Sequence, residues 1–170
     1  MSSDRIPAVE PAQPRGIFRR AFHSFGQSAA GRWYGINIGS RIDPPLLRLT
    51  RGRFATTSML PLVLLRVRGR KSGELRTIPL VYYTDGDDVI LVASSFGRAS
   101  HPAWSHNLIA NPDVELTAGG VTAPYRSEQV PEGPERERLY ELAKKNFAGY
   151  GNYETMAGER RIRVFRLSPA

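Results

Sequence analysis

The middle of the chain alternates runs of large apolar residues with short segments of glycine and charged residues. Residues 60–67, 75–83 and 89–93 are apolar and rich in branched side chains, which is typical of buried strands. Segment 69–73 and the run 85–88 separate these strands with turn-forming residues. The pattern therefore predicts an antiparallel sheet that begins with three strands joined by two hairpins.

The C-terminal part of the chain continues this alternation. Residues 114–117 and 121–128 flank the pair Gly119-Gly120, so they predict another hairpin. Charged and apolar side chains alternate over residues 161–167, which predicts a half-exposed last strand. Together, the predicted elements indicate a mainly β fold of α+β composition: an antiparallel barrel with two or three helices packed outside it.

Two helices are expected beside this sheet. Residues 102–110 form the first, with a proline suited to its opening turn and Ser100 or His101 as the N-cap. Residues 131–145 form the second, because their apolar side chains recur on one side. Residues 150–158 contain two glycines and predict a loop or irregular segment.

The N-terminal region divides into a tail and the start of the domain. Residues 1–14 are rich in proline and predict a flexible tail, and residues 15–170 predict a single domain. Apolar residues at three- and four-residue spacing over 17–25 predict an amphipathic helix flanked by arginines. Residues 15–25 could contact the anionic inner face of the cell membrane, or this helix could cover the barrel. Without a signal-peptide core, the chain is expected to be cytoplasmic.

The composition of the chain excludes several kinds of site and indicates an anionic partner. The chain has no cysteine, which excludes disulfides, thiolate zinc sites and a cysteine nucleophile. Its three histidines do not form a metal-ligand spacing, so no metal is predicted. The net charge of +8 is concentrated in residues 1–72, which hold 13 Lys and Arg against 3 Asp and Glu. An anionic partner is expected, and without a recognised nucleic-acid motif that partner is not expected to be nucleic acid.

The turn between the first two predicted strands is the first candidate binding element. Arg70, Lys71 and Ser72 offer two cations, a hydroxyl and backbone amides, and Arg76 follows on the second strand. Such a group can hold a phosphate or carboxylate through charge-assisted hydrogen bonds. The alternative is a solvated hairpin tip with ordinary charges.

Further candidates follow the third strand. Ser94 and Ser95 lie at its end, where ligands commonly bind, and Trp104 on the next helix could pack under a planar cofactor or anchor the core. Asn107 and Asn111 could bind a ligand or cap the helix. The rings at 147, 150 and 153 would share a face of a helix, form a lid if the segment is a loop, or simply pack on the barrel.

The order of these motifs resembles the deazaflavin-dependent nitroreductase and quinone reductase family, actinobacterial oxidoreductases that use coenzyme F420. The motifs occur in the order Gly-Arg-Lys-Ser-Gly at 69–73, Arg76, Pro79-Leu80, Asp85-Gly86, Ala93-Ser94, Pro102-Ala103-Trp104, Asn107-Leu108 and Ala110-Asn111-Pro112. The resemblance implies the split β-barrel of flavin-binding reductases. It also implies a cofactor with a planar deazaflavin, a phosphate and an oligoglutamate tail.

The resemblance assigns roles to particular positions. Positions that would meet the phosphate and nearby groups are Arg70, Lys71, Ser72 and Arg76. Positions that would line the deazaflavin are Thr77, Ile78, Pro79, Leu80, Val81, Val92, Ala93, Ser94, Ser95, Ala103, Trp104, Ser105, His106, Asn107 and Tyr150. The acceptor pocket would comprise Val81, Phe147, Tyr150 and Tyr153. Ser94 would hydrogen-bond the ring, and Tyr150 would protonate the product.

Departures from the family pattern bear on the acceptor. Ser95 stands where well-known members have lysine, and Val81 and Phe147 stand where a nitroimidazole-reducing member has tyrosines. Hydride transfer from reduced F420 to a quinone or enone is therefore preferred over transfer to a nitro compound. The alternatives are a split-barrel reductase that binds FMN and a protein that binds or carries F420 without turnover. The sequence does not predict the oligomeric state.

Overall fold

Six strands form the central sheet of the computed structural model, which describes residues 5–9, 49, 61–147 and 149–170. In chain order the strands are β1 (Leu62–Arg68), β2 (Leu75–Asp85), β3 (Asp88–Val92), β4 (Asp113–Ala118), β5 (Val121–Gln129) and β6 (Val164–Pro169). The helices of the same residues are α4 (Ala103–Ala110), α5 (Pro134–Asn146) and α6 (Gly149–Met156), with a short 3-10 turn, η2 (Ser95–Gly97).

The strands close into a barrel in the order β1-β2-β3-β6-β5-β4, and every neighbouring pair is antiparallel. β1–β2, β2–β3 and β4–β5 are hairpins, as the turn sequences predict. β6 lies between β3 and β5 and pairs with both, and β1 pairs with β4 to close the barrel. The predicted mainly β, antiparallel split barrel is therefore confirmed.

Side chains of alternate strand residues fill the barrel interior. Val63, Leu65 and Val67 of β1 point inward and meet Leu91 and Phe165 in one buried cluster. β3 is buried on both faces, because its other face packs under α5. This double burial explains why β3 reads as a continuous apolar run.

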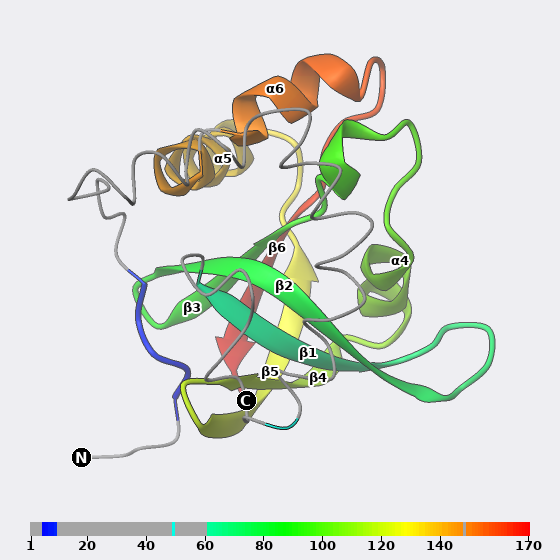
Figure 1. Cartoon of the computed structure of the whole chain (residues 1–170), viewed down its shortest axis with the longest axis vertical. Coiled ribbons are helices and arrows are strands. Elements are labelled where there is room, and N and C mark those ends of the chain that lie inside the picture. The colour runs from blue at the N-terminus through cyan, green and yellow to red at the C-terminus, as the bar shows by residue number, and fades with distance from the viewer. Residues whose placement is uncertain (1–4, 10–48, 50–60, 148) are drawn as a thin grey trace.

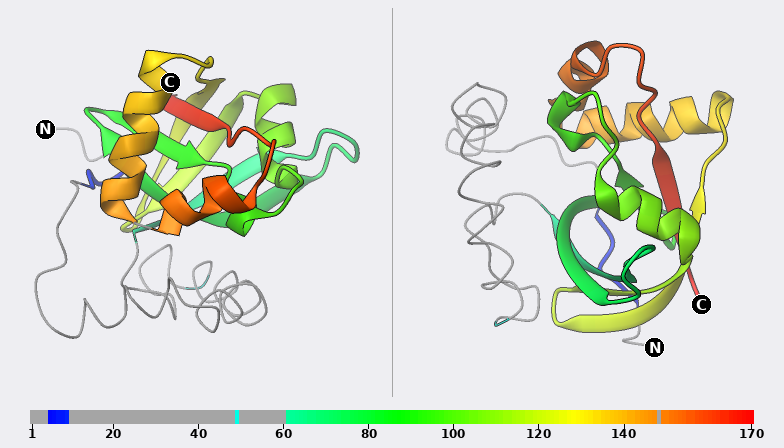
Figure 2. Two further views of the ribbon diagram at one scale, coloured as in Figure 1. Left: turned by 90° about the horizontal axis from the view of Figure 1, so that it is seen from above. Right: turned by 90° about the vertical axis from the view of Figure 1, so that its right-hand side faces the viewer.

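Helices cover the barrel in two places. α5 packs on β3 and β6, with α6 beside it, whereas α4 packs on β1 and β5 apart from them (Figures 1 and 2). No helix of the described residues is long and apolar enough to cross a membrane. The predicted helix over residues 17–25 lies outside the described residues.

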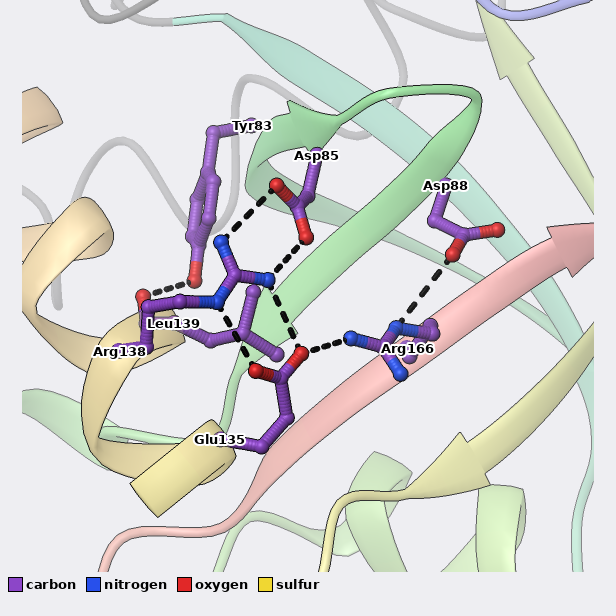
Figure 3. A network of polar contacts seen from close by, with 7 residues as sticks. All are labelled: Tyr83, Asp85, Asp88, Glu135, Arg138, Leu139 and Arg166. Carbon is purple, nitrogen blue, oxygen red and sulfur yellow. Dashed lines mark hydrogen bonds and ion pairs between the residues drawn. The ribbon is translucent and has the colours of Figure 1, made fainter.

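A surface network of charged groups fixes the start of α5 (Figure 3). Arg138 pairs with both Asp85 of β2 and Glu135, and Arg166 of β6 pairs with Glu135 and Asp88. The carboxylate of Glu135 thus lies between two guanidinium groups, which lower its pKa to about 2 through hydrogen bonds. The network ties the helix to the strands on which it packs.

The structure differs from expectation at three element boundaries. α4 begins at Ala103 with Pro102 as its N-cap, rather than Ser100 or His101, because Pro102 has an extended backbone. α5 begins at Pro134 rather than residue 131, after Gly133 adopts a φ of 148°. The last strand begins at Val164 rather than residue 161.

The region after α5 is helical, so the loop predicted over residues 150–158 is wrong for most of its length. Tyr150 and Tyr153 are both buried, and with Ala157 they join the cluster beneath α5. Burial of these side chains outweighs the low helix propensity of Gly149 and Gly151.

Residues 5–9 belong to the segment predicted to be a tail, and they lie against the barrel at the end away from α4 (Figures 1 and 2). Ile6 is buried, and its N–H donates to the hydroxyl of Tyr125 over 3.3 Å. The N–H of Val9 donates to Thr84 Oγ1 over 2.9 Å, and the Tyr82 hydroxyl donates to the Pro7 carbonyl over 3.0 Å. This segment covers one end of the core.

Candidate functional site

The basic turn between β1 and β2 is tightly closed. The Gly69 N–H donates to the Glu74 carbonyl and the Gly73 N–H to the Gly69 carbonyl, each over 2.8 Å. Gly73 has a φ of 70°, which suits glycine. A Cβ at Gly69 would lie 2.8 Å from Ser72 Oγ, so a larger residue at this position would displace the Ser72 side chain. The turn extends beyond the barrel near α4 (Figure 1).

The cations of this turn are exposed to solvent. Arg70 and Lys71 form no ion pair with an acidic residue of the described chain, whereas Arg76 pairs with Glu74 over 3.4 Å. Ser72 Oγ accepts the Glu74 N–H over 3.3 Å and helps to shape the turn. Two positive charges are therefore available to an anion.

Two asparagines of the α4 segment anchor the turn. Asn107 Oδ1 accepts the backbone N–H of Arg70, and Asn111 Nδ2 donates to the Arg68 carbonyl, both over 3.1 Å. Both side chains therefore bond the backbone of the basic turn, rather than the helix ends as the capping alternative predicts. They also place the basic turn against α4, so the two ends of the predicted site lie together.

The end of β3 forms an unusual turn. Ser95 and Phe96 have φ values of 52° and 54°, and Gly97 continues with 75°. Left-handed conformations cost free energy for residues other than glycine, and they often occur at functional sites. Ser94 and Ser95 are half-buried, and their hydroxyls form no hydrogen bond with another described residue. Both hydroxyls can therefore serve a ligand.

Arg160, which follows α6, contacts this turn. Its Nη2 donates to the Ser94 carbonyl over 2.7 Å, and its Nη1 donates to the Ala93 carbonyl over 3.1 Å. Its Nε donates to the Arg98 carbonyl over 2.8 Å. His101 Nδ1 lies 3.3 Å from Nη1. The sequence did not indicate this residue. Any residue can supply a backbone carbonyl, so bonds to distant carbonyls produce no motif in the sequence.

Two histidines connect the strand end with the basic turn. The rings of His101 and His106 meet edge to face at 5.9 Å, and Arg163 Nη1 lies 3.4 Å from His106 Nδ1. Burial, then Arg163 and Arg160, lowers the pKa of His101 to about 4, and burial with Arg163 and Arg70 lowers the pKa of His106. Both imidazoles are therefore neutral at pH 7, between cationic groups.

The other predicted residues of α4 differ in accessibility. Ala103 is exposed and His106 is half-buried. Trp104 is only 9% exposed, with its ring 5.7 Å from that of Phe165, so its main contact is with the core. Ser105 is fully buried, and its hydroxyl donates to the Pro102 carbonyl over 2.8 Å.

The predicted β2 and β3 residues lie at different depths. Residues 77–81 of β2 are all half-buried, with Ile78 and Leu80 packed toward the barrel core. Val92 and Ala93 are buried. Val81 shares a face of β2 with Tyr83, which packs in the cluster beneath α5.

The aromatic residues of the predicted acceptor pocket come together around α6. The ring of Tyr150 lies 5.5 Å from that of Phe147 and 6.1 Å from that of Tyr153. Tyr153 also meets Phe96 of the strand-end turn at 6.2 Å. Burial, then Tyr153, raises the pKa of Tyr150, so its phenol is protonated at neutral pH. The structure therefore brings the predicted acceptor side and strand end into contact.

The chain is similar to a known protein family. The F420H(2)-dependent quinone reductase family matches residues 40–169. An F420H(2)-dependent quinone reductase of Mycobacterium tuberculosis is 37% identical over 134 residues, which are 73% of this chain and 88% of that protein.

Two solved structures have the same fold. An F420-H2 dependent reductase, FDR-A, is 35% identical with a TM-score of 0.58, over 64% of this chain and 94% of that one. A structure described as a domain-swapped dimer is 32% identical with a TM-score of 0.60, over 74% of this chain and 95% of its own. The present chain belongs to the F420H(2)-dependent quinone reductase family.

Proposed function

We propose that this protein transfers a hydride from reduced coenzyme F420 to a quinone. The observation that carries the proposal is a chain of contacts that joins three predicted elements: the basic turn, the end of β3 and the aromatic cluster of α6. Asn107 joins the turn to α4, the His101–His106 ring contact joins α4 to the segment after β3, and the Phe96–Tyr153 contact joins the strand end to α6. A cofactor with an acidic tail and a planar ring could contact all three elements.

The donor groups of the site fit such a cofactor. Arg70 and Lys71 offer unpaired charges for the phosphate or the glutamate tail, within the described part of the chain. The half-buried hydroxyls of Ser94 and Ser95 offer hydrogen bonds to polar atoms of the ring. FMN, by contrast, has no support from the family match.

The protein contributes position and a proton, whereas bound reduced F420 supplies the hydride. A quinone that accepts a hydride also gains a proton on the way to the hydroquinone. Tyr150 is our candidate for the donor, because its protonated phenol lies beside Phe147 and Tyr153 of the predicted acceptor pocket. Ser94 would orient the ring, and Phe147 with Tyr153 would give the acceptor an apolar surface.

The direct test is a titration of the purified protein with F420, followed through the fluorescence of the cofactor. We expect saturation at about micromolar F420 and oxidation of reduced F420 on addition of menadione. Absence of binding at that concentration would refute the proposal. Tight binding without oxidation of the reduced cofactor would instead support a carrier protein, and a yellow protein on purification would support FMN.

The same assay defines the acceptor class. Menadione, a cyclic enone and a nitroimidazole can be compared as acceptors under identical conditions. We expect the quinone to react fastest and the nitroimidazole slowest, because apolar Val81 and Phe147 line the predicted pocket without hydroxyl groups. A nitroimidazole that reacts faster than menadione would contradict this order.

Lys71→Ala tests the role of the basic turn. We expect F420 affinity to fall about five-fold at low salt and less than about two-fold at 0.5 M salt, because salt already screens the exposed charge. Fluorescence titration at both ionic strengths measures the difference. Lys145→Ala, an exposed lysine at the far end of α5, is the control and should leave the affinity unchanged. Equal loss at both salt concentrations would contradict an electrostatic contact.

A further inference from the structure

We infer that Arg160 is a positioning residue, which fixes the turn at the end of β3 in the conformation that presents Ser94 and Ser95 to the cofactor. This inference rests on the proposed function. It adds a residue for which neither the motifs nor the family match gives a role. Three features of Arg160 support it: its bonds, the backbone that it holds, and the segment from which it comes.

The guanidinium of Arg160 binds carbonyls on both sides of the turn. Ala93 and Ser94 lie before it, at 3.1 and 2.7 Å, and Arg98 lies after it, at 2.8 Å. A planar group with five N–H donors can reach three separated carbonyls at once. The ammonium of lysine carries the same charge as a single point and cannot reproduce this geometry.

The backbone between these carbonyls requires such restraint. Ser95 and Phe96 both have left-handed backbones, at φ values of 52° and 54°. Non-glycine residues keep this conformation only where surrounding contacts impose it. The turn is also packed from outside, since a Cβ added at Gly97 would lie 2.6 Å from Met156 Cβ. Loss of the Arg160 bonds should therefore let the turn relax.

Arg160 comes from the segment directly after α6. The Ala157 N–H donates to the Tyr153 carbonyl, and the Arg160 N–H donates to the Ala157 carbonyl, over 2.9 and 3.2 Å. The side chain of Arg160 thus links the helix that carries Tyr150 and Tyr153 to the turn that carries the serines. No acidic residue of the described chain lies within ion-pair distance of its guanidinium, so backbone carbonyls are its main partners.

The test compares Arg160→Lys with Arg161→Lys, an exposed arginine one residue away. The first measurement is hydrogen–deuterium exchange of the peptide that contains residues 94–98, without cofactor. We expect exchange at least about ten-fold faster in Arg160→Lys and parental exchange in Arg161→Lys. Unchanged exchange in Arg160→Lys would overturn the inference, whether or not the protein binds F420.

The second measurement links the turn to the reaction. We expect Arg160→Lys to lower kcat with menadione at least about ten-fold at saturating F420, with retention of the folded barrel by circular dichroism. Millimolar guanidinium should restore part of the activity of Arg160→Gly and none in Arg161→Gly. A parental kcat in Arg160→Lys would overturn the positioning role. Failure of the parent protein to bind F420 would instead refute the proposed function. The exchange data would still show whether Arg160 restrains the turn.

A second variant covers the case in which Arg160→Lys does not fold. Gly97→Ala keeps Arg160 intact but drives a methyl group into Met156, so it displaces the turn from the other side. We expect faster exchange over residues 94–98 and a lower kcat, as in Arg160→Lys. Faster exchange together with a parental kcat in Gly97→Ala would show that the turn conformation does not matter for the reaction, which would overturn the inference.

Discussion

At the scale of single residues, Arg136 of α5 combines a charge with complete burial. It is 1% exposed, and its Nη2 donates to the Ile162 carbonyl over 2.8 Å. Its Nη1 pairs with Glu137 over 2.9 Å, and its guanidinium lies 4.9 Å from the centre of the Tyr140 ring. A buried charge is tolerated only where such partners replace water. Arg136 is therefore a structural anchor between α5 and the segment before β6.

Replacement of Arg136 by alanine should destabilise the protein by about 2 to 3 kcal/mol, since it leaves a cavity and removes a buried hydrogen bond. Urea denaturation followed by circular dichroism measures the loss. Arg126→Ala is the control: Arg126 pairs with Asp113 in an exposed position, so its loss should cost less than about 1 kcal/mol. Equal losses in the two variants would contradict the structural role of Arg136.

Sequence could have indicated Arg136 but not Arg160. Arg136 shares the spacing of Leu139, Tyr140 and Ala143, the buried face of α5. A charged residue on an apolar face is visible in the sequence. Arg160 lies beside Arg161 in a run of alternating charges, and only the fold brings it to the β3 end. By contrast, Arg70 and Lys71 could be predicted as binding candidates from the local glycine spacing alone.

At the scale of elements, strands were easier to predict than the segments that depend on packing. β1, β2 and β3 follow from branched apolar runs and strong turn sequences, which are local signals. α6 was missed because its two glycines indicate a loop, whereas the burial of Tyr150 and Tyr153 stabilises a helix. Residues 5–9 contain one proline and no strand pattern, and yet they pack on the barrel.

Truncation of a side chain in this N-terminal segment tests its contribution. Ile6 is 6% exposed within the barrel cluster, so Ile6→Ala should reduce the free energy of unfolding by about 2 kcal/mol. Chemical denaturation measures this change. Leu75→Ala, at a position that is 53% exposed, should cost less than about 0.5 kcal/mol. An Ile6→Ala loss as small as that control would indicate that residues 5–9 do not stabilise the barrel.

At the scale of the whole molecule, the closed barrel leaves no free edge among its six strands, and the helices are attached to its outside. Family resemblance, read from the order of motifs over residues 60–112, predicted this closure. Hydrophobic patterning alone predicts strands but not which strand completes the barrel. That choice depends on β6, which pairs with both β3 and β5 across long sequence separations.

The charged network at the start of α5 couples the stability of this assembly to pH. Glu135 has a pKa of about 2 in the folded protein, against an ordinary 4.5. A depressed carboxyl pKa contributes stability that is fully present above the ordinary value and is lost as the pH falls toward the folded value. The network should therefore weaken between about pH 4.5 and pH 2.

Glu135→Gln tests this coupling, because glutamine keeps the shape but carries no charge to pair with Arg138 and Arg166. We expect a lower Tm than the parent at pH 7 and a smaller further fall between pH 4.5 and pH 2. Glu141→Gln, which removes only an ion pair with Lys144 within α5, should follow the parent curve. The low pKa of His101 weakens the fold from about pH 6.5 to pH 4 in all three proteins, so the difference between variant and parent isolates Glu135. Parallel curves for Glu135→Gln and the parent below pH 4.5 would show that the network does not hold α5 to the barrel.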